Sequence, residues 1–147
     1  MGSKRERPRI VLVNRCILTR DDGLYLLIQR AATDSHSAGL WEFPGGKLDM
    51  GQDLRHALER EVLEETGLLV EQVSRLVYAD SYILTSKAYS GLPYVVLFSQ
   101  GRVVGGSLKL SSEHMDSAWV SYEEALEYDL APESRAAIIA LKGNVLT

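Results

Sequence analysis

The sequence predicts an α/β domain in which a mixed β-sheet lies between helices. Short apolar runs typical of strands alternate with segments of helical periodicity, in the order strands, helix, strands, helix. The 147 residues and a hydrophobic content of 46% are sufficient for one compact domain with a substantial core. We therefore expect a single domain over residues 1–147, with residues 1–8 as a flexible N-terminal tail.

The first part of the chain predicts a β-hairpin. The apolar runs Ile10–Leu18 and Leu24–Ile28 are typical of buried strands, and Asp21-Asp22-Gly23 between them is typical of a turn. The polar segment Ala31–Gly39 predicts a loop. A short strand is expected after it over Leu40–Phe43.

A turn and a helix follow this strand. Pro44-Gly45-Gly46 is expected to stop the strand, because proline and glycine favour turns. Asp53 is a suitable N-cap for a helix that continues to about Thr66, and Gly67 can supply its left-handed C-terminal position.

The second half of the chain is expected to add strands and two helices. Strands are expected over Leu69–Tyr78, Ser81–Thr85, Tyr94–Arg102 and Ala118–Ser121. Helices are expected over Tyr122–Glu127 and Pro132–Lys142, and proline is tolerated in the first turn of the second helix.

The first helix places acidic residues where a helix normally buries leucines. At 3.6 residues per turn its inward stripe contains Leu54, Ala57, Leu58, Glu61 and Glu65, with Glu64 at its edge. Carboxylates at this spacing repel one another, and partial burial makes the repulsion more costly. A divalent cation would relieve it, because hard ions such as Mg²⁺ or Mn²⁺ take oxygen ligands. A solvated acidic face is the alternative for such a cluster taken alone.

The residues around this helix resemble the Nudix box, G-x5-E-x7-R-E-U-x-E-E-x-G-U, in which U is aliphatic. The matching positions are Gly46, Arg60, Glu61, Val62, Glu64, Glu65, Gly67 and Leu68. One position departs, because Gln52 stands where the family has its first Glu. Upstream, Arg30-Ala31-Ala32, His36 and Trp41–Lys47 resemble the MutT-type branch, which hydrolyses nucleoside triphosphates to monophosphates. The resemblance implies an α/β/α sandwich and a pyrophosphohydrolase that acts on phosphoric anhydrides.

The resemblance also implies a site for Mg²⁺ or Mn²⁺. Its ligands would be the Gly45 carbonyl and the carboxylates of Glu61, Glu64 and Glu65. In the family, the residue that matches Glu61 is either a further ligand or the base that activates water. We expect Glu61 to be the base.

Two further residues are expected to assist catalysis. The long guanidinium of Arg60 can hold a neighbouring carboxylate by charge-assisted hydrogen bonds, and the resemblance assigns it an orienting role. Glu113 lies six residues before Trp119, where MutT-type members have an acidic loop residue that assists metal binding or catalysis. An ordinary exposed loop acid is the alternative for Glu113.

Substrate-binding residues are suggested by the same resemblance. Arg30 and Lys47 are expected to contact phosphates, and His36, Glu42 and Phe43 to border the nucleoside. The MutT-type enzyme that removes oxidised guanine nucleotides reads the base with an Asn near the start of its C-terminal helix. Here Ser134 or Glu133 stands at that position. An oxidised guanine nucleotide, a pyrimidine nucleotide and a broad range of bases therefore all remain open.

Charge and hydropathy exclude several classes of partner. The net charge of −4 and the absence of a basic block beyond the N-terminus argue against a long nucleic acid. The apolar runs are too short for a membrane span, and the charged start lacks a signal sequence, so we expect a cytoplasmic protein. The single cysteine, Cys16, is expected to be a buried structural thiol. Family members often form homodimers, so a homodimer is an open expectation.

Gln52 raises an alternative function. Glutamine keeps a carbonyl acceptor but lacks the charge of glutamate, so a catalytically weakened domain could bind a nucleotide as a sensor or scaffold. ADP-sugars or dinucleoside polyphosphates are alternative substrates that need the same box. An active enzyme is favoured, because the later carboxylates of the box are intact and carry the chemistry in the family.

Overall fold

The computed structural model describes residues 9–34, 37–74, 76–83 and 91–144, and within them eight strands form one mixed sheet. The main path of the sheet has the order β3-β2-β1-β7-β5, while β4 pairs with β1, β6 with β7 and β8 with β2. The strands are β1 (Val11–Thr19), β2 (Tyr25–Arg30), β3 (Trp41–Glu42), β4 (Gly45–Lys47), β5 (Leu68–Gln72), β6 (Tyr78–Ile83), β7 (Pro93–Gly106) and β8 (His114–Val120).

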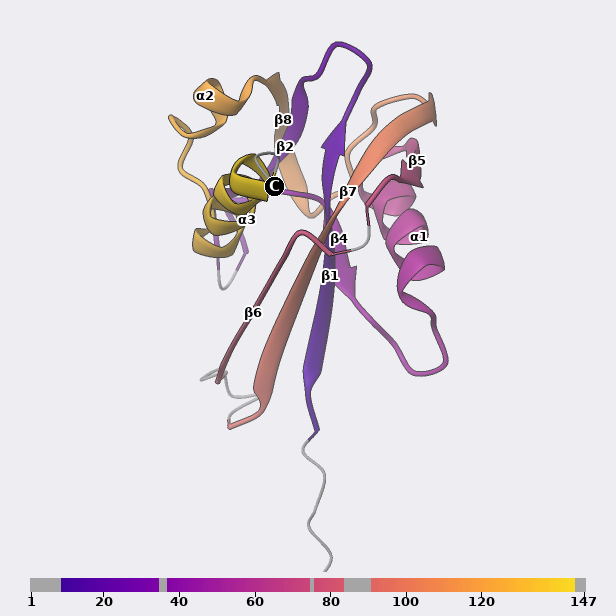
Figure 1. Ribbon diagram of the computed structural model, residues 1–147, viewed down its shortest axis with the longest axis vertical. Coiled ribbons are helices and arrows are strands. Elements are labelled where there is room, and N and C mark those ends of the chain that lie inside the picture. The colour runs from indigo at the N-terminus through magenta and orange to yellow at the C-terminus, as the bar shows by residue number, and fades with distance from the viewer. Residues whose placement is uncertain (1–8, 35–36, 75, 84–90, 145–147) are drawn as a thin grey trace, which may run out of the picture.

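Helices cover both faces of this sheet (Figure 1). Helix α1 (Leu54–Thr66) lies on one face, and α2 (Tyr122–Ala125) and α3 (Pro132–Asn144) lie on the other. Because successive side chains of a strand point to opposite faces, β1 contributes to both cores. Ile17 packs in the core that contains Ile138 of α3, and Cys16 packs in the core that contains Val62 of α1. The expected α/β/α sandwich is thereby confirmed.

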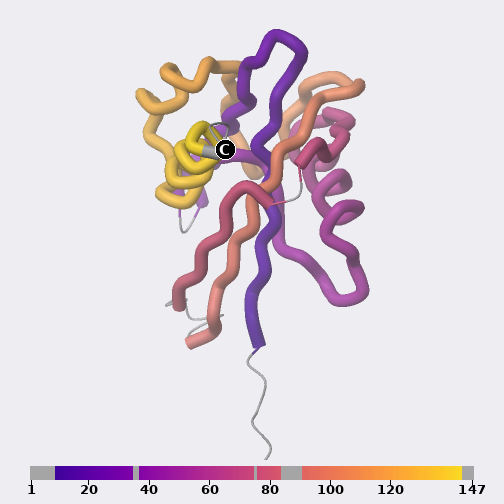
Figure 2. Tube along the Cα trace, in the orientation of Figure 1, coloured from indigo at the N-terminus to yellow at the C-terminus, as the bar shows by residue number. Residues whose placement is uncertain are grey.

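Three strands extend beyond the region that the helices cover. Figure 2 shows β1, β6 and β7 side by side below the helices. β7 pairs in parallel with β1, with Val11 opposite Tyr94, and antiparallel with β6, with Tyr82 also opposite Tyr94. The pairing places these three residues in one row across the extended part of the sheet.

Several expected boundaries need correction. The segment Pro44-Gly45-Gly46 does more than stop a strand, because Gly45–Lys47 forms β4 and pairs with β1. Glycine permits this close pairing, since a Cβ atom on Gly45 would lie 2.2 Å from the Asn14 carbonyl oxygen. The single strand expected over Leu69–Tyr78 is also wrong. β5 ends at Gln72 and β6 begins only at Tyr78, and the two strands pair with different parts of β7.

Helix α1 has the expected ends but a different buried face. The Asp53 side chain accepts a 2.9 Å hydrogen bond from the His56 amide, and Gly67 has a left-handed φ of 75°. The buried face includes Leu58, Val62 and Glu65, whereas the Leu54 side chain is exposed. The stripe expected from Leu54 was therefore wrong at its first turn. That turn is held instead by the side-chain amide of Asn14, which donates a 2.7 Å hydrogen bond to the Leu54 carbonyl.

The expected N-terminal tail and the end of the strand expected over Ser81–Thr85 lie outside the described residues. Across the part of the chain that the structure describes, no helix is long and apolar enough to cross a membrane.

Candidate active site

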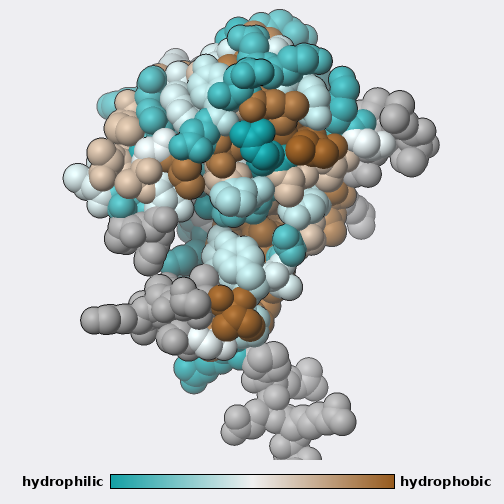
Figure 3. Space-filling view, turned by 90° about the vertical axis from the view of Figure 1, so that its left-hand side faces the viewer, coloured by the Kyte–Doolittle hydropathy of each residue, from teal (hydrophilic) through white to brown (hydrophobic). Residues whose placement is uncertain are grey.

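The fold forms a cleft of about 810 Å³ that is lined by residues of α1, the start of α3, several strands of the sheet and the loops after β2 and before β8. Figure 3 shows the molecule from the side of α2 and α3, with a recess below the helical layer. Acidic side chains gather in one part of the cleft, and we call Asp49, Glu61, Glu65 and Glu113 the carboxylate group. Tyr82 and Tyr94 line another part and form the tyrosine group.

Glu65 is the buried member of the carboxylate group. It emerges from the inner face of α1 toward β4, and its Oε2 atom accepts a 3.3 Å hydrogen bond from the Gly45 amide. Its exposed fraction is only 8%. Burial raises the pKa of Glu65 to about 8, although the charge of Arg15 and the Gly45 hydrogen bond act in the opposite direction. A buried carboxylate of this kind is suited to bind a cation.

Glu61 lies one turn earlier on α1 and packs against the backbone of β4. A Cβ atom on Gly46 would come within 2.5 Å of Glu61 Oε2, so the close contact requires glycine. Burial and the charge of Glu64 raise the pKa of Glu61. Arg60 Nη2 donates to Glu61 Oε1 at 3.3 Å, and Arg60 Nε lies 3.7 Å from Glu64 Oε1. Arg60 thus holds two carboxylates, which is the geometry that its expected orienting role requires.

Glu42 is the centre of a buried charge network behind the cleft. Its exposed fraction is 2%. Its carboxylate lies 3.5 Å from Arg15 Nη2, accepts from Arg30 Nη1 at 3.0 Å, and lies 2.9 Å from His114 Nε2. Burial alone would raise the pKa of Glu42, but Arg15, the His114 hydrogen bond and Arg30 hold it below its ordinary value. The network fixes two guanidinium groups at the wall of the cleft.

Glu113 is placed by the loop before β8. The Ala31 amide donates a 3.0 Å hydrogen bond to the Glu113 carbonyl, which ties this loop to the end of β2. The next residue, His114, is buried against Glu42. The Glu113 side chain lines the cleft. Its backbone is held by the Ala31 hydrogen bond and by the buried neighbour His114.

The structure brings most of the expected site residues together. Those that line the cleft are Arg30, Glu42, Gly45, Lys47, Glu61, Glu65 and Glu113. Glu64 and Arg60 lie beside it on α1, with the Glu64 side chain 60% exposed. His36 lies outside the described residues.

Phe43 and Ser134 are placed in the interior rather than at the cleft. Phe43 has no exposed surface and belongs to the core beneath α3. The buried Ser134 hydroxyl accepts from the Phe43 amide at 3.4 Å. Its neighbour Glu133 lines the cleft instead. Of the two residues at the expected base-reading position, Glu133 is thus the one that a substrate can reach.

The cleft is also lined by Arg15, Tyr82 and Tyr94, which were not among the site residues expected from the sequence. Arg15 was detectable in principle, because a charged residue in the middle of an apolar strand is unusual. The two tyrosines carry no comparable signal, since aromatic residues are common in ordinary strands.

The donor set fits a hard divalent cation, because carboxylates and a backbone carbonyl supply only oxygen ligands. Among the described residues, no group of three or more His, Cys, Asp or Glu side chains converges on one point. Mg²⁺ does not require such a group, since it usually keeps several waters and binds one or two carboxylates. Gly45, Glu61 and Glu65 line the cleft together, so two carboxylates are available there, and their role as metal ligands stays a prediction.

The chain matches the NUDIX domain family over residues 11–141. It belongs to this family. It is 30% identical over 135 residues to nucleoside triphosphatase NudI of Escherichia coli O139:H28, covering 87% of this chain and 94% of that protein. The solution structure of the E. coli ORF135 protein has 33% identity and a TM-score of 0.70, covering 92% of this chain and 91% of that one. The MutT protein from Methanosarcina mazei Go1 has 26% identity and a TM-score of 0.76, covering 98% and 100%.

The resemblance found in the box is therefore confirmed. The protein is a Nudix pyrophosphohydrolase that acts on phosphoric anhydrides of nucleoside diphosphate derivatives. Nudix hydrolases generally use divalent metal ions and bind nucleotides as small-molecule substrates.

Proposed function

We propose that this Nudix hydrolase cleaves a nucleoside triphosphate to the nucleoside monophosphate and pyrophosphate, with Mg²⁺ or Mn²⁺ as cofactor. The observation that carries this proposal is the cleft, which joins a carboxylate group to a pair of stacked tyrosines. The carboxylate group suits a metal-bound polyphosphate, and the stacked tyrosines suit a nucleotide base. The relative NudI, which is named a nucleoside triphosphatase, supports the same substrate class.

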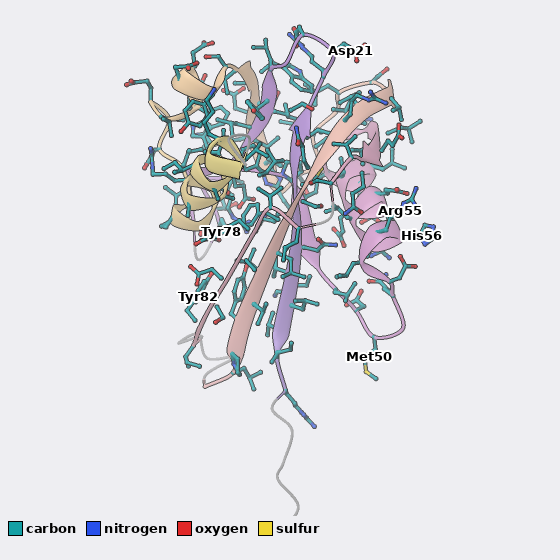
Figure 4. The ribbon with its side chains drawn as sticks, in the orientation of Figure 1. Asp21, Met50, Arg55, His56, Tyr78 and Tyr82 are labelled. Atoms are coloured by element: carbon teal, nitrogen blue, oxygen red, sulfur yellow. The ribbon has the colours of Figure 1, made fainter. Side chains whose placement is uncertain are left out.

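The tyrosine group offers a surface for the base. The rings of Tyr82 and Tyr94 are stacked, with centroids 4.6 Å apart and planes 21° apart. Figure 4 labels Tyr82 on β6, at the extended end of the sheet. Tyr82 is 43% exposed, so its ring is accessible to a ligand. Aromatic side chains stack on any base, which suits nucleotides in general and does not by itself select one.

Cationic side chains that line the same cleft are suited to the phosphates. Arg30 lines the cleft and is held by Glu42 and Asp34. Lys47 lines it from the end of β4. A guanidinium held in place by carboxylates is already oriented for a phosphate, so less side-chain entropy is lost on binding.

The residues of α1 are placed to support attack by water on phosphorus. When bound, the divalent ion would neutralise phosphate charge and lower the pKa of a coordinated water. Glu61 is the proposed base that accepts the proton, because it lines the cleft one helical turn from Glu65. A new bond forms between the water oxygen and phosphorus, the anhydride bond breaks, and pyrophosphate leaves. Arg60 would keep Glu61 and Glu64 in position during this transfer.

The side chain of Gln52 makes a local contact in the loop before α1. Its Oε1 atom accepts a 2.9 Å hydrogen bond from the Asp49 amide, so it closes the loop before α1. The later carboxylates of the box, Glu61 and Glu65, line the cleft, and this supports an active enzyme over a nucleotide sensor that has lost catalysis.

The proposal is tested by pyrophosphate release from ATP, GTP, CTP, UTP and oxidised dGTP, with Mg²⁺, with Mn²⁺ and with chelator. We expect metal-dependent pyrophosphate release from at least one triphosphate, and its loss in Glu65→Gln. Glu59→Gln is the matched control, because Glu59 lies on the same helix and pairs with Arg55 outside the cleft. No release from any triphosphate, with a nucleotide still bound, would support the sensor. If ADP-ribose or a dinucleoside polyphosphate is cleaved and no triphosphate is, the substrate belongs to the class of the compound that is cleaved.

A further inference from the structure

Arg15 is an unusual residue for its position in the fold. It lies in the middle of β1 and pairs with Gly45 of β4 on one side and Phe98 of β7 on the other. Its exposed fraction is 8%, yet it lines the cleft. Burying an arginine in a central strand is unfavourable unless its charge and hydrogen-bond donors have partners. A reason for its presence is therefore required.

The protein partners of Arg15 use only part of its donor capacity. A guanidinium carries five N–H donors. Nη1 donates to the Phe43 carbonyl at 3.0 Å, and Nη2 lies 3.5 Å from Glu42 Oε1, a long contact. The buried Nε atom has no partner among the described residues. Glu42, for its part, already has Arg30 and His114. Neutralising Glu42 is thus an incomplete explanation of Arg15.

The side chains of β1 form the floor of the cleft in a defined order. Val11, Val13 and Arg15 lie on one face of the strand and all line the cleft. Val11 pairs with Tyr94 of the tyrosine group, and Arg15 pairs with Gly45 beside the carboxylate group. The two ends of this floor are about 13 Å apart along the strand, at about 3.3 Å per residue. Arg15 is thus the cation of this floor, four residues along β1 from the residue that pairs with Tyr94, and Lys47 of β4 lies opposite Val13 between them.

The electrostatic neighbours of Arg15 agree with this intermediate position. The carboxylates whose charges act on Arg15 are those of Glu42, Glu65 and Glu133, which come from β3, α1 and α3. Arg15 also lines the same cleft as Tyr94. A nucleotide whose base stacks on the tyrosines and whose phosphates reach the carboxylates would place its first phosphate at this junction.

We propose that Arg15 binds the phosphate that stays on the nucleoside after cleavage, the α-phosphate of a nucleoside triphosphate. The planar guanidinium matches two phosphate oxygens, and its contact with the Phe43 carbonyl fixes its orientation before the substrate arrives. This inference rests on the proposed function for the identity of the substrate. It adds a substrate-binding residue outside the Nudix box.

The test separates the two products of the reaction. Inhibition constants are measured for the nucleoside monophosphate and for pyrophosphate with wild type, Arg15→Met, Arg15→Lys and Arg102→Met. Arg102 is the matched control, because it lies on β7 and pairs with Glu71 at the surface. In Arg15→Met we expect the KM of the triphosphate and the inhibition constant of the monophosphate to rise about tenfold or more, since hydrogen bonds to charged groups are lost. The inhibition constant of pyrophosphate should change less than twofold.

Arg15→Lys should recover part of the monophosphate affinity because it keeps the charge, and Arg102→Met should behave as wild type. Equal losses for monophosphate and pyrophosphate, or no loss for either, would overturn the proposal. Thermal unfolding identifies a variant that fails to fold. If Arg15→Met fails to fold, the test uses Arg15→Lys instead, and compares its inhibition constants for the monophosphate and for pyrophosphate in the same way.

Failure of the proposed function is recognised separately. If wild type hydrolyses no nucleoside triphosphate, calorimetric titration with AMP, GMP, CMP and UMP replaces inhibition. Monophosphate binding that weakens in Arg15→Met and not in Arg102→Met would then still support the role of Arg15, and equal binding by both would overturn it.

Discussion

His114 Nε2 lies 2.9 Å from Glu42 Oε2, with both side chains almost fully buried. This contact joins the loop that carries Glu113 to the short strand that precedes Gly45. The same carboxylate binds Arg15 and Arg30, so one buried residue organises several parts of the cleft. Glu42 therefore positions two guanidinium groups and also lines the cleft, and its expected place at the border of the nucleoside stays a prediction.

Glu42→Gln should destabilise the protein strongly. The neutral amide leaves Arg15 without its buried counter-charge and leaves Arg30 with Asp34 alone, and breaking a buried ion pair costs about 3 to 5 kcal/mol. Chemical denaturation of wild type and variant measures the difference. Glu71→Gln is the control, because it removes an exposed ion pair with Arg102 and should cost under about 1 kcal/mol. Equal effects of the two substitutions would contradict the network.

The lowered pKa of Glu42 also predicts how the free energy of unfolding depends on pH. The folded state holds the pKa of Glu42 below its ordinary value, so the folded state favours the carboxylate form more than the unfolded state does. This contribution is fully present above the unfolded pKa of about 4.3 and is lost as the pH falls through the lower folded pKa. The free energy of unfolding of wild type should therefore fall below about pH 4.3 more steeply than that of Glu42→Gln. Parallel pH curves for the two proteins would refute this.

Gln52→Glu should leave activity unchanged or raise it. A carboxylate can accept the hydrogen bond from the Asp49 amide just as the present amide oxygen does, so the loop before α1 should keep its form. The family pattern also places Glu there. Steady-state hydrolysis of the best triphosphate measures the effect. A large fall in kcat would mean that Gln52 has a role of its own that the loop geometry does not reveal.

The fold was largely predictable from local signals along the chain. Asp53 and Gly67 set the ends of α1 because capping depends on residues that are adjacent in sequence. The errors occur where pairing partners are distant. Whether Gly45–Lys47 forms a strand depends on β1, and where β5 gives way to β6 depends on β7. Leu54 was misplaced for a similar reason, since its turn is held by Asn14 from another element.

The site was predictable where a motif covers it and less so elsewhere. The box located Glu61 and Glu65, whose carboxylates line the cleft. Tyr82 and Tyr94 were missed because only the pairing of β6 with β7 brings them into a stack. Phe43 was expected at the nucleoside, but its ring packs in the core beneath α3.

Cys16 should be unreactive in the folded protein. It is 1% exposed in the core beneath α1, and burial raises the pKa of its thiol to about 12. The thiolate is the reactive form, so very little of it exists at pH 8. A disulfide reagent that releases a coloured thiolate should react slowly with the native protein and rapidly after the protein is unfolded in guanidinium. Rapid stoichiometric labelling of the native state would show that the strand opens locally.

Gly46→Ala should reduce activity far more than stability. Its methyl group would lie 2.5 Å from Glu61 Oε2, at the far end of a flexible side chain, so Glu61 is expected to move while the backbone of β4 stays. Displacing a catalytic group by about 1 Å can lower the rate about a hundredfold. Gly143→Ala is the matched control, because that position near the end of α3 has open space around it. Steady-state kinetics with thermal unfolding separates the effects, and an active Gly46→Ala enzyme would show that Glu61 need not occupy its present position.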